Sequence, residues 1–417
     1  MKEKISGRKR MNIILKDTLS FEQKINLMKE DAKFDVVDAK ISYGHQFSDE
    51  ESIPDPTIFQ TIHSKKAPPK VPKVFMSNNC SFNCAYCGCR ASRDNCQRYI
   101  NTPREIAEIA IKEAKKNGYG IFLTSAIYKN ANYTQELMIE ALKIMRNDFY
   151  YKGYIHAKVM PGTDSALIEK TGRYANRLSV NIEVAQNKGY ELIAKQKNKE
   201  NILLPMLQIS SLIKENGGRG GRYGNPFANS QTTQLMAGST GESDRTIMAL
   251  SKALYKKYNL KRVYYTAFQY KNPAKGYELE SVTTPLWRVR RLYQADRLIQ
   301  LYGYSPDEIT PSEEPDLKED MDPKIAWAIR NIHLFPIEVN TADYEILLRI
   351  PGIGIVYASK IIEARRYGKV THQGLKKMGV SLKKSNYFIT CNGVYDGGFF
   401  IDYPDLLYKM FSEQENV

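Results

Sequence analysis

The chain has 417 residues, a length that fits two or three domains better than one compact module. Hydrophobic residues make up 42% of the sequence and charged residues 26%, which is an ordinary globular composition. No stretch approaches the ~18 consecutive apolar residues of a membrane-spanning helix. The first apolar run, residues 11–15, is shorter than the core of a signal peptide. The sequence therefore excludes an integral membrane protein and predicts a cytoplasmic protein with no membrane partner.

Charge is distributed unevenly along the chain, whose net charge is +15. Residues 1–304 hold 48 basic and 29 acidic side chains, whereas residues 305–323 hold eight acidic side chains and one lysine. A large basic body indicates a polyanionic partner, most simply nucleic acid. A solvated, lysine-rich surface gives the same count, so charge alone leaves both interpretations open.

The order of apolar patterns predicts an α/β fold. One helical pattern covers Phe21–Phe34, and the proline-containing stretch Ile53–Lys73 is expected to be a wrapping loop. From residue 74 onward, short apolar runs alternate with helical patterns, which predicts six parallel βα units and a partial (β/α)6 barrel. The expected strands are Val74–Met76, Gly120–Ser125, Tyr154–Met160, Leu178–Val184, Thr233–Gly238 and Arg262–Phe268. The expected helices between and after them are Pro103–Asn117, Gln135–Met145, Asp164–Thr171, Asp244–Tyr258 and Leu286–Tyr302.

Four segments follow from these patterns. We expect an N-terminal extension over residues 1–73, the barrel over 74–304, an acidic interdomain linker over 305–323 and a small all-α domain over 324–417. A glycine- and arginine-rich insertion precedes the fifth strand, and its Arg219 and Arg222 are candidate contacts to a nucleic-acid backbone.

The strongest chemical signal is the spacing Cys80-x3-Cys84-x2-Cys87, directly after the first expected strand and with Tyr86 before the last cysteine. Three thiolates on one loop can bind three irons of a [4Fe–4S] cluster and leave the fourth iron without a protein ligand.

A structural zinc site is the alternative for these cysteines. Such a site needs four ligands, and no second short-spaced pair follows, although Cys89 and Cys96 could supply a ligand. Cys89, Cys96 and Cys391 are otherwise left without an assigned role.

The cysteine spacing with its aromatic residue resembles the radical S-adenosylmethionine (SAM) superfamily, and the resemblance extends over about residues 74–304. It implies a partial barrel of radical SAM type, and S-adenosylmethionine bound to the open iron through its amino and carboxylate groups. It also implies a 5′-deoxyadenosyl radical that abstracts a hydrogen atom, and an electron donor such as flavodoxin or ferredoxin.

The same resemblance assigns polar residues at three strand ends to the cofactor. Where the superfamily often carries Gly-Gly-Glu after the second strand, this sequence has Leu123 to Ala126, which still allows close backbone approach. A structural hydrogen bond at a strand end is the alternative for each polar side chain. The assigned residues are Thr124, Ser125, Asn181, Glu183, Gly238 and Glu242.

A second signal covers residues 340–366. Asn340 is expected to cap a helix that runs to Arg349, after which Pro351-Gly352-Ile353-Gly354 forms a tight turn into a second helix. This pattern resembles the helix-hairpin-helix motif, whose glycines let backbone amides at a helix N-terminus face a nucleic-acid phosphate. Such contacts do not read base edges, so binding is expected to be independent of sequence.

The surroundings of this hairpin are basic. Residues 340–390 contain nine basic and three acidic side chains, and residues 375–384 look like a degenerate second copy of the motif. The same hairpin could serve only to pack helices together. The residues assigned to nucleic acid are Gly352, Gly354, Lys360, Lys376, Lys377, Lys383 and Lys384.

The whole chain resembles the family of radical SAM proteins assigned to DNA modification or repair, on the two signals above together with the segments Asp31–Val36 and Leu292–Asp296. The resemblance implies an enzyme that abstracts hydrogen from nucleic acid, DNA rather than RNA, and a partner like uracil-DNA glycosylase. The alternatives are an RNA-modifying radical SAM enzyme and a nucleic-acid-binding protein with a structural metal and no turnover. No side chain is assigned to catalysis.

Overall fold

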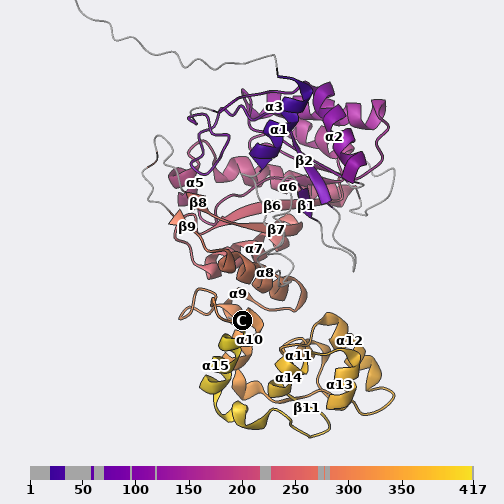
Figure 1. Ribbon diagram of the computed structural model, residues 1–417, viewed down its shortest axis with the longest axis vertical. Coiled ribbons are helices and arrows are strands. Elements are labelled where there is room, and N and C mark those ends of the chain that lie inside the picture. The colour runs from indigo at the N-terminus through magenta and orange to yellow at the C-terminus, as the bar shows by residue number, and fades with distance from the viewer. Residues whose placement is uncertain are drawn as a thin grey trace, which may run out of the picture. The chain divides into compact units, whose positions relative to one another are not determined.

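The computed structural model describes residues 19–32, 58–60, 70–93, 96–117, 120–216, 227–270, 277 and 282–415 (Figure 1). The predicted contacts of Arg219 and Arg222, and the Asp31–Val36 segment beyond Ala32, lie outside these residues. Contacts divide the chain into two compact units. The first ends at Leu235 and resumes over Lys257–Thr283, and the second contains Met236–Lys256 and the chain from Thr284 onward.

The first unit is built on a seven-stranded sheet with the order β1 to β7, in which β2 to β7 run parallel. This confirms the α/β fold and the six predicted strands. Every residue of β3 is buried, as expected for a parallel strand covered on both faces. The strands are β1 (Ile58–Gln60), β2 (Lys70–Phe75), β3 (Ile121–Thr124), β4 (Ile155–Lys158), β5 (Arg177–Ser179), β6 (Ser230–Ala237) and β7 (Leu260–Ala267). A short hairpin of β8 (Gln269–Tyr270) and β9 (Val282–Thr283) follows.

The register of the sheet aligns residues of neighbouring strands in rows. Leu123 pairs with Ala157 and Ala157 with Leu178, and all three are fully buried. In the adjacent row Ser179 pairs with Lys158. Because side chains alternate along a strand, Lys158 and Ser179 lie on the opposite face from Ala157 and Leu178.

Helices α2, α3, α4 and α6 pack next to one another in this order, and α2 packs against β2 and β3. In α2 the fully buried Ile106 and Ala110 are four residues apart, so they lie on one helix face. The elements of this unit are α1 (Phe21–Ala32), α2 (Pro103–Asn117), α3 (Ala131–Lys143), the π-helix η2 (Ile144–Asp148), α4 (Ser165–Tyr174), α5 (Lys188–Ile193) and α6 (Lys199–Glu215).

Two features of this unit differ from the sequence analysis. The prediction of a loop over Ile53–Lys73 is wrong, because β1 pairs antiparallel with the start of β2 and places Ile58 opposite Pro72. Helix α6 has no counterpart among the predicted helices. It contains Pro205, a residue that normally argues against a helix interior.

The second unit contains most of α7 (Asp244–Tyr258) and all elements after β9. Its core includes edge-to-face aromatic contacts from Trp327 to Tyr304 and Phe335, and from Phe335 to Phe388. Its further helices are α8 (Leu286–Leu301), α9 (Pro306–Ile309), α10 (Pro323–Arg330), η3 (Ile332–Leu334), α11 (Tyr344–Leu347), α12 (Ile355–Ala364), α13 (His372–Met378), α14 (Leu382–Ser385), η4 (Asn386–Phe388), η5 (Gly398–Asp402) and α15 (Pro404–Glu415). No helix in the described part of the chain is long and apolar enough to cross a membrane.

The C-terminal part of this unit is not all-α, contrary to the prediction. Strands β10 (Ile337–Glu338) and β11 (Ile389–Thr390) form a two-stranded parallel sheet in which Ile337 pairs with Ile389. Both strands are only two residues long, and no periodicity of two can be read from so short a run.

The acidic segment 305–323 is packed within the second unit. The Asp244 carboxylate of α7 accepts a hydrogen bond from the Leu317 amide at 2.9 Å and lies 2.7 Å from the Arg288 guanidinium. The Arg245 amide donates to the Pro315 carbonyl oxygen at 2.8 Å. The predicted domain boundaries are at residues 304 and 323. In the structure, the chain passes from one compact unit to the other after residues 235, 256 and 283.

Glu338 ties β10 to the turn after β11. Its carboxylate accepts hydrogen bonds from the backbone amides of Asn340, Asn392 and Gly393 at 2.8–3.0 Å and from the Asn340 side chain at 2.7 Å. Burial by itself raises the pKa of Glu338, but these donors outweigh it and lower the pKa to about 2.

Asn340 does not cap the following helix as predicted. Its side chain binds Glu338 and both backbone groups of Val370, at 2.7–3.0 Å. Helix α11 begins at Tyr344, with Asp343 at the N-cap position. The polar side chain of Asn340 therefore joins two distant segments instead of starting a helix.

We expect Glu338→Gln to destabilise the second unit at neutral pH and to flatten its acid unfolding. The pKa of Glu338 is about 2, against ~4.3 for an unfolded glutamate, so its contribution is complete above ~4.3 and is lost as pH falls towards 2. Both tryptophans of the chain, Trp287 and Trp327, belong to this unit, so their fluorescence in the full chain reports its unfolding. Exposed Glu363→Gln is the matched control, and identical acid curves for wild type and Glu338→Gln would contradict the prediction.

Candidate functional site

The cysteine loop leaves β2 at the carboxyl edge of the parallel sheet, where α/β sheets bind their ligands. Two backbone hydrogen bonds fix the loop to other connections of the same unit. The Ser81 amide donates to the Ile127 carbonyl oxygen beyond β3 at 2.7 Å, and the Ala85 amide donates to the Ile193 carbonyl oxygen in α5 at 2.8 Å. The positions of the thiols are therefore set by three different parts of the fold.

None of the six cysteines, all within the described residues, forms a disulfide, and Cys80, Cys84 and Cys87 influence one another electrostatically. Burial raises the pKa of Cys80, and the negative charge of Cys87 raises it further. Burial also raises the pKa of Cys84 to about 12, although the Lys197 ammonium opposes this effect. Metal ions replace the thiol protons, so cation binding relieves the repulsion among these thiolates. The donor set therefore fits an iron–sulfur cluster.

A single metal ion would need several ligands around one point. Within the described ranges, no group of three or more His, Cys, Asp or Glu side chains is placed to hold one ion. Each thiolate of a [4Fe–4S] cluster binds a different iron, so its ligands need not converge in this way.

A buried ion pair lies beside the cysteine loop. Lys197 Nζ lies 2.7 Å from Glu183 Oε1 and 3.0 Å from the Tyr86 hydroxyl, and the side chains of Lys197 and Glu183 are 11% and 4% exposed. Burial by itself lowers the pKa of Lys197, but the Glu183 carboxylate outweighs it and raises the pKa above its ordinary value. A positive charge is thereby held near the thiols of Cys84 and Cys87.

Glu183 occupies a left-handed backbone conformation, with φ of +65°, which is uncommon outside glycine. Its amide donates to the Gln234 carbonyl oxygen at 2.9 Å, so the chain after β5 is held against β6 at this point. Such strain persists only where the surroundings impose it. Lys197, the partner of Glu183, was missed by the sequence analysis because it lies in a polar connection between α5 and α6 that carries no motif.

The other predicted cofactor residues of this unit also follow parallel strands. Asn181 lies beyond β5, is buried, and its Nδ2 is 3.5 Å from Gln234 Oε1. Thr124 ends β3 and is buried, and the Ser125 hydroxyl donates to the Ala126 carbonyl oxygen at 2.6 Å. The structure places them at the predicted strand ends, and their contact with a cofactor stays a prediction.

Gly238 and Glu242 form a self-contained turn after β6, in the second unit. The Glu242 carboxylate accepts hydrogen bonds from the amides of Gly238 at 2.6 Å and Thr240 at 2.8 Å. Gly238 has φ of +79°, and a Cβ atom there would lie 2.0 Å from the Thr284 hydroxyl. Glu242 therefore shapes the turn with both carboxylate oxygens.

The predicted glycine turn joins α11 to α12 in the second unit. Gly352 has φ of +82°, as expected for one of the two glycines, and a Cβ atom there would lie 3.0 Å from the Ser381 carbonyl oxygen. A Cβ atom at Gly354 would lie 2.9 Å from the Tyr302 hydroxyl. Packing and backbone conformation thus favour glycine at position 352, whereas a side chain at position 354 would have to displace only the Tyr302 hydroxyl.

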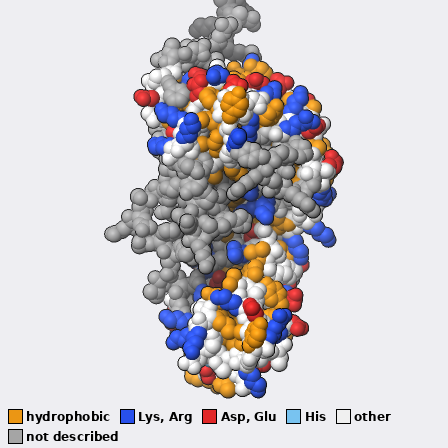
Figure 2. Space-filling view, turned by 90° about the vertical axis from the view of Figure 1, so that its right-hand side faces the viewer, with side chains coloured by type: hydrophobic (Ala, Val, Ile, Leu, Met, Phe, Trp, Pro, Cys, Tyr) orange, Lys and Arg blue, Asp and Glu red, His pale blue; other side chains and the backbone are white. Residues whose placement is uncertain are grey.

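The segment predicted as a second copy also contains two helices, α13 and α14, around Gly379. A Cβ atom at Gly379 would lie 3.3 Å from the Tyr357 hydroxyl of α12, so each glycine turn packs against the other hairpin. Figure 2 faces the side on which α12 and α13 lie in Figure 1, and there Lys and Arg side chains surround apolar ones on the second unit. Of the five predicted lysines, Lys360, Lys376, Lys377 and Lys383 are exposed and Lys384 is partly exposed.

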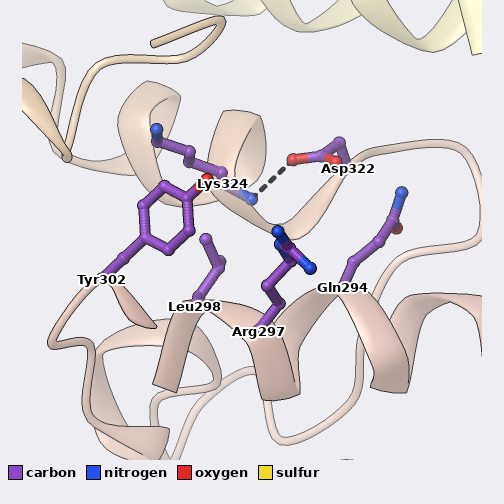
Figure 3. A pocket seen from close by; sticks show the side chains of 6 residues that line it. All are labelled: Gln294, Arg297, Leu298, Tyr302, Asp322 and Lys324. Atoms are coloured by element: carbon purple, nitrogen blue, oxygen red, sulfur yellow. Dashed lines mark hydrogen bonds between the residues drawn. The ribbon is translucent and has the colours of Figure 1, made fainter. Parts of the chain in front are cut away.

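A buried lysine holds the first glycine turn in place. Lys324 Nζ donates to the Ile353 carbonyl oxygen at 2.6 Å and lies 4.8 Å from the centre of the Tyr302 ring. Burial lowers the pKa of Lys324 to about 7, with Asp322 opposing this effect and Arg349 adding to it. The side chains of Lys324, Tyr302 and Asp322 border a cavity of about 160 Å³ (Figure 3). The remaining residues that line it are Gln294, Arg297 and Leu298.

We expect Glu183→Gln to destabilise the first unit by about 3–5 kcal/mol, because it leaves the Lys197 ammonium buried without its carboxylate. The double variant with Lys197→Met should recover much of this loss. Denaturant unfolding of the apoprotein followed by far-ultraviolet circular dichroism measures both effects. The exposed pair Glu169–Arg173 supplies the control, Glu169→Gln, for which about 0–1 kcal/mol is expected. Equal losses in the two single variants would contradict a buried pair.

Comparison with known proteins identifies the domain that carries the cysteine loop. Residues 74–252 match the Radical SAM superfamily, a range that includes all three cysteines. No curated protein matches the chain.

Two solved structures show a distant likeness. One is the FeFe-hydrogenase maturase HydG from Carboxydothermus hydrogenoformans, with a TM-score of 0.40 and 16% identity over 54% of this chain and 50% of HydG. The other is the radical S-adenosylmethionine methyltransferase TsrM from Kitasatospora setae, with a TM-score of 0.34 and 10% identity over 48% of this chain and 37% of TsrM. The chain thus spans half or less of these proteins, and the superfamily match is the basis for assignment. Residues 74–252 therefore form a radical SAM domain, the kind of domain that uses a [4Fe–4S] cluster and S-adenosylmethionine.

Proposed function

We propose that Cys80, Cys84 and Cys87 bind three irons of the cluster and leave the fourth for S-adenosylmethionine. The support is the placement of three mutually interacting thiols on one loop at the carboxyl edge of the sheet. When bound by these cysteines, the cluster would supply the electron for reductive cleavage of S-adenosylmethionine and thereby for abstraction of a hydrogen atom from the substrate. A low-potential donor such as flavodoxin or ferredoxin is the proposed source of that electron.

Residues of the first unit would orient the cofactor beside this loop. We propose that Asn181 and Glu183 receive the ribose hydroxyls, while the backbone of Thr124 and Ser125 approaches the methionine part. Glu183 is already connected to the loop, because Lys197 binds both its carboxylate and the Tyr86 hydroxyl.

The turn after β6 carries the two remaining predicted cofactor residues. We propose that Gly238 and Glu242 flank the adenine, as the resemblance implies. The Glu242 carboxylate is engaged with the Gly238 and Thr240 amides, so its role would be to shape the backbone that faces the base.

We propose further that the substrate is nucleic acid, with DNA favoured over RNA by the family resemblance. The observation that carries this proposal is the N-terminus of α12, which no side chain caps. A helix N-terminus favours a phosphate through its amides and its dipole. A lysine side chain lies near this turn, since Lys384 Cβ is 3.2 Å from the position of a Cβ atom placed at Gly352.

The charge of the surrounding surface supports the same proposal. Lys360 is exposed on α12, and Lys376, Lys377 and Lys383 are exposed on the second hairpin. Contacts of this kind reach phosphates and not base edges, so affinity would depend steeply on salt and little on sequence. RNA offers the same phosphates, and an RNA substrate is therefore the second candidate.

The decisive experiment is anaerobic reconstitution followed by incubation with DNA or RNA. Formation of 5′-deoxyadenosine that depends on one nucleic acid, together with a changed nucleoside detected by mass spectrometry of its digest, supports the proposal for that substrate. Turnover of S-adenosylmethionine that neither DNA nor RNA stimulates or alters would overturn the nucleic-acid assignment and leave the radical SAM enzyme standing.

Each of the single variants Cys80→Ala, Cys84→Ala and Cys87→Ala should lose cluster binding. Wild type is expected to take up about four irons per chain, and each variant close to none, because the remaining thiolates leave two irons without a protein ligand. Iron and sulfide analysis and dithionite-bleachable visible absorbance measure the effect. Cys391→Ala, a buried thiol of the second unit, is the control and should bind the cluster normally. Normal iron uptake by any of the three variants would remove that cysteine from the ligand set.

Replacing Lys376, Lys377, Lys383 and Lys384 by Ala in the full chain should weaken binding to DNA of any sequence. For each phosphate that the variant no longer neutralises, the slope of log affinity against log salt should flatten by about 0.9. Fluorescence anisotropy over a salt series measures the slope. S-adenosylmethionine cleavage without substrate should be unchanged.

The matched control removes the same charge from exposed lysines of the first unit. It replaces Lys115, Lys116, Lys170 and Lys199 by Ala. A larger loss of affinity in this control than in the hairpin variant would place the nucleic-acid anchor on the first unit and contradict the assignment.

A further inference from the structure

A buried arginine donates hydrogen bonds to the backbone on both sides of the cysteine loop. Arg98 is 9% exposed, and its Nη1 donates to the carbonyl oxygens of Asn78 at 2.7 Å and Cys89 at 2.9 Å. Its Nη2 donates to the Arg90 carbonyl oxygen at 2.6 Å. One guanidinium therefore binds the backbone two residues before Cys80 and that of the second and third residues after Cys87.

The segment that carries Arg98 is itself fixed to the end of β2. The Asn78 side chain donates to the Gln97 carbonyl oxygen at 2.9 Å and accepts a hydrogen bond from the Tyr99 amide at 2.8 Å. Ser77 pairs with Ile100 as an isolated antiparallel bridge. The guanidinium thus projects from an anchored strand-like segment, and its planar fork can serve three carbonyls at once, which a lysine ammonium on a flexible stem does less well.

A continuous path leads from this guanidinium to a predicted cluster ligand. The Cys89 amide donates to the Cys87 sulfur at 3.4 Å, and the Cys89 carbonyl oxygen is held by Arg98. The Arg90 amide donates to the Cys87 carbonyl oxygen at 3.2 Å, and the Arg90 carbonyl oxygen is also held by Arg98. Arg98 therefore fixes both residues whose amides bind Cys87.

We propose that Arg98 is a positioning residue that sets the reduction potential of the cluster through the amide that faces the Cys87 sulfur. This inference rests on the proposed role of Cys87 as an iron ligand. Hydrogen bonds to cluster sulfur atoms stabilise the more negative, reduced state, and outer residues that orient them tune the potential. Without the Arg98 guanidinium, Cys89 and its amide are held less firmly, so the potential shifts in the negative direction.

The test compares Arg98→Lys and Arg98→Met with wild type after anaerobic reconstitution of the full chain. Iron per chain and the midpoint potential, from a redox titration followed by electron paramagnetic resonance without S-adenosylmethionine, are the two readouts. Both variants should show a more negative midpoint than wild type, with the larger shift in Arg98→Met, which removes charge as well as geometry. Arg104→Met removes an exposed guanidinium of the same unit and should leave the midpoint unchanged.

The outcomes separate this inference from the proposed function. Variants that bind cluster at the wild-type midpoint, with or without a loss of iron, show a merely structural arginine and overturn the inference alone. If Arg98→Met does not fold, Arg98→Lys decides, since it keeps the charge and cannot reproduce the three hydrogen bonds. Wild type without cluster, or Cys87→Ala with a normal cluster, overturns the proposed ligand set and this inference together.

Discussion

Holding three thiols close together in a poorly hydrated place is the constraint on which the first unit depends. Burial and mutual repulsion both raise the pKa of Cys80 and Cys84, so these thiols favour their protonated form unless a metal cation replaces the protons. The chain meets this constraint by fixing the loop from outside, through the Ile127 and Ile193 carbonyl groups and the Arg98 guanidinium. Parallel strands bring these distant connections to one edge of the sheet, which is why a cofactor of this kind suits the βα architecture.

Two buried lysines show how strongly the pKa of a lysine depends on the groups around it. Lys197 and Lys324 are the same residue in similarly enclosed places, yet the pKa of Lys197 is raised and that of Lys324 is lowered to about 7. Lys197 has a carboxylate at 2.7 Å, whereas Lys324 has a carbonyl oxygen and an aromatic ring, with Arg349 adding to the effect of burial. The first lysine is therefore a fixed charge beside the thiols, and the second is mainly a hydrogen-bond donor that fastens a turn.

Local patterns in the sequence predicted much of the fold and the centre of the candidate site. Pro103–Asn117 and Asp244–Tyr258 have the predicted bounds because their apolar residues recur with helical spacing, and the cysteine spacing is contiguous. Lys197 and Arg98 could not be found this way, since neither belongs to a periodic pattern or a motif, and Lys197 is 111 residues from Tyr86. Asn340 failed as a cap for the same reason, because its side chain binds Val370 across the turn. Long-range hydrogen bonds leave no periodic trace in a sequence.

The exchange of the chain between the two compact units affects how the protein is made. The second unit takes Met236–Lys256 before the first unit has received Lys257–Thr283, and it is completed only by the chain from Thr284 onward. During synthesis, we therefore expect each unit to complete its core only after residues of the other have emerged from the ribosome. Domains made of one continuous segment fold in order from the N-terminus. A domain made of separated segments keeps apolar surface exposed until its last segment has been synthesised. We expect assembly of this protein to be a late and concerted event, sensitive to pauses in translation between residues 235 and 284.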